Sequence, residues 1–508
     1  MAQNYYITTP IYYVNDRPHI GHIYTTILAD VFARSHRLLG DDVFYLTGTD
    51  EHGQKVQDAA EARGLEPIQH ADEMVVQFQE IWKDLHISND DFIRTTEPRH
   101  TSVVSEVLSD LYDRGEIYAG EYEGWYCKHC ERFWTKKDLV EGNCPNADCL
   151  RPVSVISEKN YFFRMGKRRD WLIDHIRKNE NFILPASRRN EVLGFLDGPL
   201  GDLCISRPKT RLSWGIPLPF DEDYVTYVWF DALLNYVSAV GHRRHDSFEK
   251  WWPASLHLIG KDIVTTHCVY WPTMLEAMGL PLPKSILAHG WWTYRGDKVS
   301  KSKGGAIDPR PLIENIGLDA FRTVLLREMV IGADADYSEE RLVARYHSDL
   351  ANDLGNLHYR TLSMIQKFLG GKAPKPGPGG PLQEKAESLK KDYRSLVESY
   401  SFNDLLDRVF DLVREGNREI DRGQPWRLAR EKKTEEVGRV LYGVAEAVRL
   451  AFLYLSPLQP TTAAEARRTL GLDGTWGKLD EEGQWGGLPA GSEVRVGKPL
   501  FPRLEPRE

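Results

Sequence analysis

The chain has 508 residues and a formal net charge of −9; 41% of its residues are hydrophobic and 27% are charged. This length exceeds what one hydrophobic core usually holds, so we expect roughly two to four domains, and the acidic balance excludes a protein that binds nucleic acid through overall positive charge. Because the sequence has neither a secretory signal pattern nor a run of roughly 18 apolar residues, we expect a cytoplasmic protein that does not cross a membrane.

Strand-like and helix-like segments alternate along much of the chain. Strands are expected within 5–10, 43–53, 224–230, 255–260 and 285–290, and the segment HIGH opens a helix that runs to Gly40. Such alternation is typical of a parallel α/β sheet, in which ligands bind beyond the carboxyl ends of the strands. The polar residues expected at these ends are Asp50, Asp231, Gly260, Asp262 and His289.

Two regions depart from this alternation. Residues 118–211 interrupt it and contain a cluster of four cysteines, which indicates an inserted domain. From about residue 340 the pattern becomes helical. The Gly/Pro-rich stretch at 370–381 follows a single helix, so we interpret it as a long loop within a helical bundle.

The segment HIGH places His19 and His22 on one face at the start of the expected helix. The amide groups and dipole of a helix start attract phosphate, and Gly21 lets a nucleotide approach the backbone closely. The two imidazoles could then stabilise charge that grows on a phosphate during reaction. Taken alone, the motif is explained as well by two structural histidines.

The segment KVSKS, residues 298–302, follows the last expected strand and precedes a pair of glycines. Lys298, Ser300 and Lys301 predict a mobile cationic loop that closes over polyphosphate and then releases pyrophosphate. A solvated basic loop is the alternative. Because HIGH follows the first strand and KVSKS follows the last strand, the two motifs together favour an ATP site.

Four cysteines have the spacing C-x2-C, thirteen residues, then C-x4-C. Cys127, Cys130, Cys144 and Cys149 can supply four thiolates to a tetrahedral zinc ion. Such a closed site leaves no open position for chemistry, so its expected role is structural. The alternatives are Asp148 as the fourth ligand, or free buried thiols.

These motifs resemble the class I aminoacyl-tRNA synthetases, and among them the methionyl-tRNA synthetase family. The resemblance covers nearly the whole chain, through TTPIYYVN, TGTDEHG, NYFFRM, ISRP, WGIP, YVWFDALLNY, IGKDIVTTHCVYWP, HGWW, DLGNL and QPW. It implies an α/β fold with a Rossmann-like parallel sheet of the HUP type, an inserted connective domain with a zinc knuckle, and a carboxyl-terminal α-helical bundle. The implied division is 1–117 and 212–294 for the two halves of the Rossmann catalytic domain, 118–211 for the inserted domain, 295–345 for the KVSKS loop and stem-contact region, and 346–508 for the α-helical anticodon-binding domain.

The family reaction has two steps. The methionine carboxylate attacks the α-phosphate of ATP and Mg²⁺-pyrophosphate leaves; the 3′-terminal ribose hydroxyl of tRNA(Met), initiator tRNA included, then attacks the carbonyl of methionyl-adenylate. The resemblance assigns ATP contacts to His19, Gly21, His22, Gly260, Asp262, Lys298, Ser300 and Lys301. Among these, His19, His22, Lys298 and Lys301 match the catalytic residues.

Asp50 matches the family carboxylate that holds the ammonium group of methionine, although from its context alone it could be a helix cap. The other methionine-binding positions of the family are mostly apolar or aromatic, which suits a polarisable thioether. They match Ile11, Tyr13, Trp229, Ala232, Leu233, Tyr236, Ile263, His267 and Trp271. Without the resemblance, Trp229 and Trp271 would be interpreted as core residues.

In the helical region, Asn356 and Arg360 are four residues apart and share one helix face, and Trp426 follows Pro425. They match the family residues that read the CAU anticodon, and such side chains stack on or hydrogen-bond to unpaired bases. A core position for Trp426 is the alternative. The sequence ends without a further tRNA-binding module, which often drives dimerisation in this family, so we expect a monomer.

Three rival interpretations stay open. Another class I synthetase, for cysteine, leucine, isoleucine or valine, would carry a larger editing insertion or use zinc in its amino acid pocket. A small-molecule ligase or nucleotidyltransferase with an HxGH motif would lack the helical region with Asn356, Arg360 and Trp426. An RNA-binding or scaffold protein that has lost catalysis would not need both HIGH and KVSKS.

Overall fold

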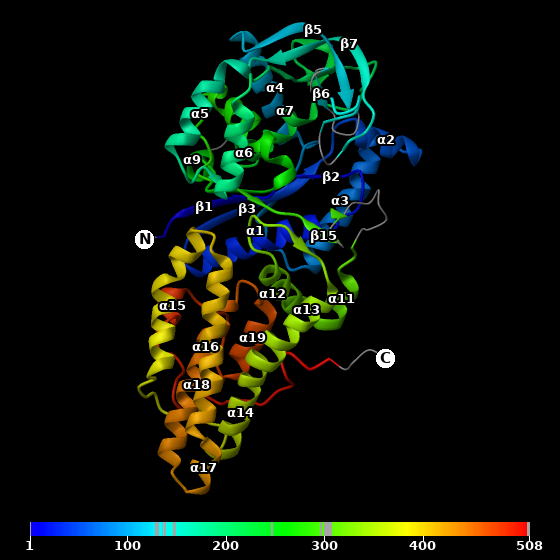
Figure 1. Ribbon diagram of the computed structural model, residues 1–508. Coiled ribbons are helices and arrows are strands. Elements are labelled where there is room, and N and C mark those ends of the chain that lie inside the picture. The colour runs from blue at the N-terminus through cyan, green and yellow to red at the C-terminus, as the bar shows by residue number, and fades with distance from the viewer. Residues whose placement is uncertain are drawn as a thin grey trace.

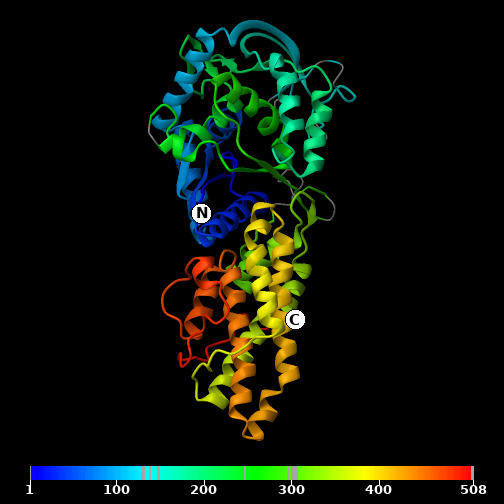
Figure 2. The ribbon, with the colours of Figure 1, turned by 90° about the vertical axis from the view of Figure 1, so that its left-hand side faces the viewer.

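The computed structural model describes residues 2–127, 132–134, 136, 139–145, 149–244, 247–294, 297–298 and 307–504. The molecule is elongated, with an α/β part at one end and a bundle of helices at the other (Figure 1). The view turned by 90° shows the same division (Figure 2). Among the described helices, none is long and apolar enough to cross a membrane.

A seven-stranded parallel sheet lies at the centre of the α/β part. Its strands are β1 (Asn4–Thr8), β2 (Tyr12–Tyr13), β3 (Asp42–Asp50), β4 (Asp91–Arg94), β8 (Ile183–Leu184), β13 (Leu256–Gly260) and β14 (Ile286–His289). Their order is β2-β3-β1-β13-β14-β8, and β4 also pairs with β3. The chain leaves β1 towards β3 and later returns on the other side as β13. This reversal leaves a crevice at the carboxyl ends of β1 and β13, where ligands bind in such folds.

The sheet confirms the α/β fold and the strands expected within 5–10, 43–53, 255–260 and 285–290. All residues of β13 and β14 are buried, as is usual for parallel strands with helices on both faces. The helices of the α/β part are α1 (Ile20–Leu38), α2 (Gln54–Ala62), α3 (Pro67–Asp84), α4 (Pro98–Asp113), α5 (Arg169–Lys178), α6 (Ala186–Leu196), α7 (Val228–Leu233), α8 (Asn235–Ser238), α9 (Ser247–Trp251) and α10 (Trp271–Met278).

The strand expected at 224–230 is wrong in two respects. β12 (Asp221–Thr226) ends early and belongs to a separate antiparallel sheet with β10 (Ser206–Pro208) and β11 (Pro217–Leu218), and helix α7 begins at Val228. Within α7, Asp231 is fully buried and bonded to two histidines. An apolar run can be buried as a strand or as a helix. Here the tertiary contacts of Asp231 with the two histidines stabilise the helix.

The predicted insertion contains a four-stranded sheet in the order β6-β5-β7-β9. Its strands are β5 (Ile117–Cys127), β6 (Arg132–Trp134), β7 (Ser154–Phe163) and β9 (Leu203–Cys204). β8 also falls within 118–211, but it pairs with β14 at the edge of the central sheet. This stretch of chain therefore contributes one strand to the central sheet.

After β14 the chain forms a small sheet in the order β16-β15-β17 and then turns helical. The strands are β15 (Trp292–Tyr294), β16 (Asp297–Lys298) and β17 (Ala335–Asp336). The helices are α11 (Arg310–Ile316), α12 (Leu318–Glu328), α13 (Glu339–Arg345), α14 (Asn356–Leu369), α15 (Pro381–Glu398), α16 (Phe402–Gly423), α17 (Pro425–Arg430), α18 (Thr434–Leu455), α19 (Pro460–Thr469) and α20 (Leu479–Glu482), with a π-helical segment at Tyr346–Gly355. The loop predicted at 370–381 is confirmed for residues 370–380, because α14 ends at Leu369 and α15 begins at Pro381.

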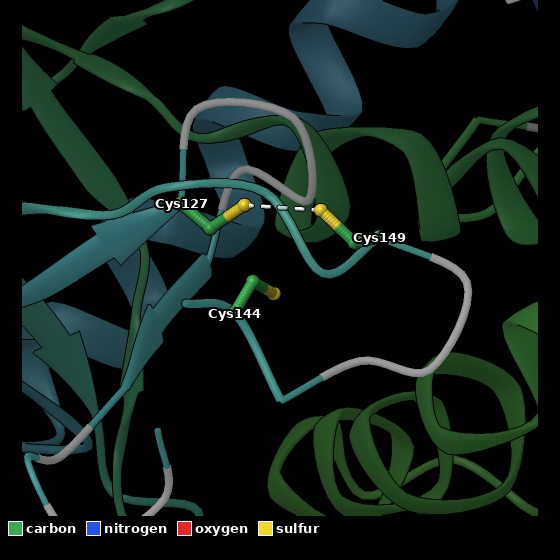
Figure 3. Close-up of side chains that lie close together, drawn as sticks. All are labelled: Cys127, Cys144 and Cys149. Atoms are coloured by element: carbon green, nitrogen blue, oxygen red, sulfur yellow. Dashed lines mark hydrogen bonds between the residues drawn. The ribbon is translucent and has the colours of Figure 1, made fainter. Parts of the chain in front are cut away.

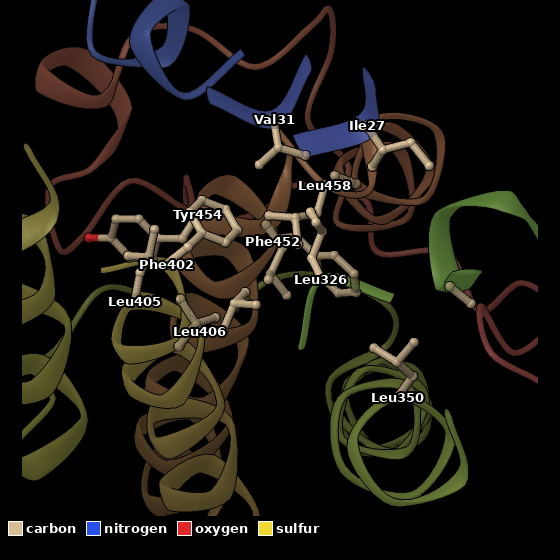
Figure 4. Close-up of a cluster of buried hydrophobic side chains, with 14 of the residues drawn as sticks. Ile27, Val31, Leu326, Leu350, Phe402, Leu405, Leu406, Phe452, Tyr454 and Leu458 are labelled. Atoms are coloured by element: carbon tan, nitrogen blue, oxygen red, sulfur yellow. The ribbon is translucent and has the colours of Figure 1, made fainter. Parts of the chain in front are cut away.

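Helix α1 joins the two parts of the molecule. Its residues Ile27 and Val31 face a buried apolar cluster that Phe402, Phe452 and Leu458 of the helical part share (Figure 4). Helix α1, which begins within HIGH, therefore packs through Ile27 and Val31 against the core of the helical bundle.

The same junction contains a buried ion pair. Arg322 of α12 is fully buried and donates to Asp30 of α1 at 2.5 Å and to the carbonyl oxygens of Leu85, Pro457 and Leu458. Burial raises the pKa of Asp30, but the charges of Arg322 and of Arg34 outweigh it and lower the pKa below its usual value. One guanidinium thus holds three segments of chain together.

We expect Arg322→Met to lower the free energy of unfolding by about 3 kcal/mol, because it leaves buried polar groups without their donor. The thermal unfolding midpoint measures the loss. Arg408→Met is a matched control, since Arg408 forms a largely exposed ion pair with Asp392, and such pairs contribute less than about 1 kcal/mol. Equal midpoints for the two variants would contradict the bridging role of Arg322.

Candidate functional site

A cavity of about 580 Å³ lies beyond the carboxyl ends of β1, β3, β13 and β14. It brings together most of the residues that the sequence singled out for ATP and methionine. These are Ile11, Tyr13, His19, Gly21, His22, Asp50, Trp229, Ala232, Leu233, Tyr236, Gly260, Asp262, Ile263 and His267. The nucleotide and amino acid candidates therefore share one space.

The two histidines of HIGH shape the start of α1. Nδ1 of His19 accepts a hydrogen bond from the Gly21 amide at 3.1 Å, and Nδ1 of His22 lies 3.4 Å from the His19 amide. The rings stack with their centroids 3.8 Å apart. Because both Nδ1 atoms accept, the proton of each neutral ring is on Nε2. Each imidazole thus carries an N–H donor that suits a phosphate oxygen.

Gly21 has a steric reason to be glycine. A Cβ atom at this position would lie 2.9 Å from Cε1 of His19, so a side chain would displace that ring. One turn later, the Thr25 hydroxyl lies 2.9 Å from the Gly21 carbonyl and 2.7 Å from Nε2 of His289. His289 ends β14, as expected, and its Nδ1 bonds to the Gly290 carbonyl. The turn of HIGH is thereby linked to the end of β14.

The methionine candidates form a pocket with a neutral polar pair. Asp50 is buried at the end of β3, beside Tyr13 of β2. His267 donates from Nδ1 to the Ile263 carbonyl at 3.0 Å, so its Nε2 accepts from the Tyr236 hydroxyl at 2.8 Å. Burial lowers the pKa of His267 to about 4, despite the opposing effect of the Ile263 carbonyl. At neutral pH this wall is uncharged and fixed in orientation, which suits an apolar side chain.

Trp271 is not among the described residues that line the cavity. It is fully buried and packs against Tyr236, with ring centroids 5.8 Å apart. Its indole N–H donates to Nε2 of His257 at 3.2 Å, and Nδ1 of His257 bonds to Thr8 at 2.7 Å. Trp271 therefore forms a second layer behind the pocket wall.

Asp231 also lies away from the cavity lining, in α7. It accepts hydrogen bonds from His52 and His100, both at 2.7 Å. Burial by itself raises the pKa of Asp231, but the two histidines outweigh it and hold the pKa at about 2. The bonded carboxylate fixes the helix that presents Trp229 and Ala232 to the cavity.

The segment around Gly260 connects the cavity to the strands that precede KVSKS. Asp262 accepts from the Trp291 indole at 3.2 Å. The Lys261 ammonium lies 3.8 Å from the centre of the Trp291 ring and 2.6 Å from Asp334. In β16, Lys298 pairs with Thr293 through the backbone. Ser300 and Lys301 lie outside the described residues.

Several residues of the cavity were not singled out from the sequence. They are Pro10, Tyr12, Asn15, Asp16, Ile20, Thr25, Lys55, Arg151, Asn235, Gly290, Trp291 and Trp292. Some lie inside quoted motifs, and Trp291 and Trp292 belong to HGWW. Arg151 comes from the inserted region, and only the folded chain brings it here.

Three of the four predicted metal ligands are close together (Figure 3). The Sγ atoms of Cys127, Cys144 and Cys149 lie within 4.8 Å of one another, and those of Cys127 and Cys149 are 3.5 Å apart. A tetrahedral thiolate site with bonds of about 2.3 Å places its sulfur atoms roughly 3.8 Å apart. The cluster fits a metal ion, with one vertex left for a fourth ligand. Cys130, and the alternative ligand Asp148, lie outside the described residues.

The anticodon candidates lie far from the cavity. Asn356 and Arg360 are on α14, and Trp426 is on α17 at the far end of the helical part (Figure 1). The Trp426 side chain is 36% exposed, which excludes a core position, and Arg360 lies 3.4 Å from Asp421. All three side chains are thus at least partly accessible from outside.

Comparisons with known proteins point in one direction. The family model of class I tRNA synthetases (M) matches residues 5–154 and 149–362. The methionine–tRNA ligase of Thermotoga maritima is 45% identical over 99% of this chain and 81% of its own length, and that of Streptomyces coelicolor is 43% identical over 99% and 97%. A structure of Mycobacterium tuberculosis methionyl-tRNA synthetase in complex with methionyl-adenylate superposes with a TM-score of 0.94 and 39% identity, covering 99% of this chain and 100% of that chain.

We expect the purified protein to contain one tightly bound metal ion per chain, as measured by native mass spectrometry with elemental analysis. Cys144→Ser should lose it, because this thiol is one of the three that meet. Cys204→Ser is the control, since Cys204 lies outside the cluster. A folded wild-type protein without metal would rule out the site.

Proposed function

This chain belongs to the class I tRNA synthetases (M), the methionyl-tRNA synthetase family, and from this premise we propose which residues carry each step of its reaction. The enzyme is a ligase that activates methionine with ATP and joins it to tRNA. A carboxylate oxygen of methionine attacks the α-phosphorus, the bond to the bridging oxygen breaks, and pyrophosphate leaves. The tRNA ribose hydroxyl then attacks the acyl carbon, loses its proton, and AMP leaves.

One observation carries the proposal: a single cavity joins the HIGH turn to Asp50 and the Tyr236–His267 pair. Two substrates that react directly must lie within about 3.5 Å of each other, and a shared cavity permits this. We assign the ATP phosphates to the HIGH end and the amino acid to the Asp50 end.

For the first step, we assign to Nε2–H of His19 and of His22 the stabilisation of charge on the α-phosphate. Gly260 and Asp262 hold the adenosine. Lys298, Ser300 and Lys301 follow β15 in the chain and are assigned to the leaving pyrophosphate. Mg²⁺, brought by the nucleotide, neutralises further phosphate charge.

For amino acid selection, Asp50 binds the substrate ammonium. Tyr13, Trp229 and the Tyr236–His267 pair surround the thioether together with Ile11, Ala232, Leu233 and Ile263. Trp271 acts from behind Tyr236. The neutral wall favours methionine over charged side chains, because a charge would lose its hydration without gaining a partner.

For tRNA selection, we propose that Trp426 stacks on an anticodon base and that Asn356 and Arg360 contact the base edges of tRNA(Met), initiator tRNA included. The metal at the cysteine cluster is proposed to be zinc with a structural role. The division into 1–117, 118–211, 212–294, 295–345 and 346–508, the monomeric state and the cytoplasmic location stay predictions.

Pyrophosphate exchange into ATP, measured with each of the twenty amino acids, tests the amino acid assignment. Methionine alone should support exchange. Asp50→Asn should raise the KM for methionine roughly 10- to 100-fold, the loss expected for one charged hydrogen bond, and change the KM for ATP much less. Exchange with a second amino acid at the rate seen with methionine would overturn the assignment.

Trp426→Ala should reduce kcat/KM for tRNA charging roughly 10- to 100-fold, because base stacking on an aromatic ring contributes about 1–3 kcal/mol. Methionine-dependent exchange uses no tRNA and should stay at the wild-type rate. Trp171→Ala is a matched control, since Trp171 is 37% exposed but lies on α5. Equal charging rates for wild type and Trp426→Ala would refute the anticodon role.

A further inference from the structure

The main chain around Asp50 is bonded on both sides. The carbonyl of Thr49 accepts a hydrogen bond from the Thr95 amide at 3.3 Å, and the amide of Glu51 donates to the Thr95 hydroxyl at 3.0 Å. The carbonyl of Asp50 accepts from the Val14 amide at 3.3 Å. The carboxylate assigned above to the substrate ammonium is therefore carried by a fixed stretch of backbone.

Glu51, the residue after Asp50, anchors this stretch through its side chain. It is fully buried, and each of its carboxylate oxygens accepts one arginine N–H and one threonine hydroxyl. Arg94 of β4 donates to them at 2.8 and 2.9 Å, and Thr49 and Thr96 both donate at 2.6 Å. The planar guanidinium matches the carboxylate in a two-bond fork, which is the geometry that compensates best for burial of a charge.

Arg94 also joins this anchor to helix α3. Its Nη2 atom donates to Asp72 of α3 at 2.5 Å. Burial by itself lowers the pKa of Arg94, but the hydrogen bonds to Glu51 and Asp72 outweigh it and raise the pKa. The guanidinium thus stays charged between the end of β3 and α3.

The same turn of α3 supports the opposite side of the amino acid pocket. His70 is buried, and its Nδ1 accepts from Arg63 at 2.9 Å, so its Nε2 donates to the Val14 carbonyl, also at 2.9 Å. Val14 follows Tyr13, which lines the cavity and pairs with Asp50. One helical turn therefore holds the two segments that present Tyr13 and Asp50.

These supporting residues can affect the substrate only through others. Glu51, Arg94 and His70 are not among the described residues that line the cavity. A carboxylate that is already held in place loses little conformational freedom when an ammonium group binds, whereas a loosely held one must first be ordered. Anchoring the residue next to Asp50 should therefore strengthen methionine binding.

We propose that the Glu51–Arg94 ion pair, braced by α3, positions Asp50 for the methionine ammonium and so sets the affinity for the amino acid. The inference rests on the role proposed above for Asp50. Arg94 is a positioning residue, because it acts through Glu51 and the main chain of Asp50.

Methionine-dependent pyrophosphate exchange measures the effect of Arg94→Met, which keeps the length of the side chain and removes its charge. The KM for methionine should rise roughly tenfold, while kcat and the KM for ATP should change less than about twofold. Arg94→Lys keeps the charge and should retain most of the affinity. Arg99→Met is the matched control, since Arg99 forms a two-bond pair with Asp91 that does not involve Glu51.

A milder variant covers the case in which Arg94→Met does not fold. Thr96→Val has nearly the same shape and removes one of the four hydrogen bonds to the Glu51 carboxylate. It should raise the KM for methionine about threefold and leave the KM for ATP unchanged. Equal increases in both KM values would show a general loss of structure and would contradict the proposal.

The decisive measurement is a double-mutant cycle with Asp50→Asn. In the Asp50→Asn background, Arg94→Met should raise the KM for methionine less than about twofold, because no carboxylate is left to position. Thr96→Val completes the same cycle if Arg94→Met is unstable. A full effect of either change in that background would overturn the proposal.

A substrate analogue tests the same coupling from the ligand. The compound 4-(methylthio)butanoate has the methionine skeleton without its ammonium group, and its inhibition of exchange gives a dissociation constant. Arg94→Met should leave this constant unchanged, and a tenfold increase would contradict the proposal. If Asp50→Asn alone leaves the KM for methionine unchanged, the role proposed for Asp50 fails, and this outcome is distinct from additive effects in the cycle.

Discussion

The buried guanidinium of Arg322 is the contact on which the arrangement of the molecule depends. It bonds to Asp30 in the middle of α1 and to three carbonyl groups from two other segments. Arginine suits this place because its planar group offers five donors and keeps its charge when buried. Since α1 begins at HIGH, the orientation of the ATP candidates is set by contacts in the helical part. The apolar cluster around Ile27 and Val31 adds the packing that excludes water from the ion pair.

Inside the α/β part, buried imidazole rings with defined proton positions hold neighbouring aromatic side chains in place through hydrogen bonds. His257 and His267 each use both nitrogens, one as donor and one as acceptor, and burial lowers the pKa of both. Neutral rings in fixed tautomers orient Tyr236 and Trp271 without placing a charge next to the pocket. Asp231 differs from these neutral rings, because it is a buried group that keeps its charge. Its two histidine partners outweigh the effect of burial and hold its pKa at about 2.

Local sequence signals predicted the elements that local chemistry determines. Alternating segments gave β1, β3, β13 and β14, the histidines of HIGH marked the start of α1, and the Gly/Pro-rich stretch marked the loop before α15. The run at 224–230 failed, because an apolar segment does not reveal whether it will be buried as strand or helix. Arg322 and Arg151 gave no local signal at all, since their partners are distant in the chain and appear only when it folds.

The two-layered wall at Tyr236 has a bearing on how substrate preference can change. The ring that lines the cavity is held from behind by Trp271 and His257, which do not line it. A smaller residue in the second layer opens space that Tyr236 can move into, so the pocket deepens while its inner surface keeps the same chemical groups. The shape of the pocket can therefore evolve separately from its chemistry, through positions that do not line the cavity.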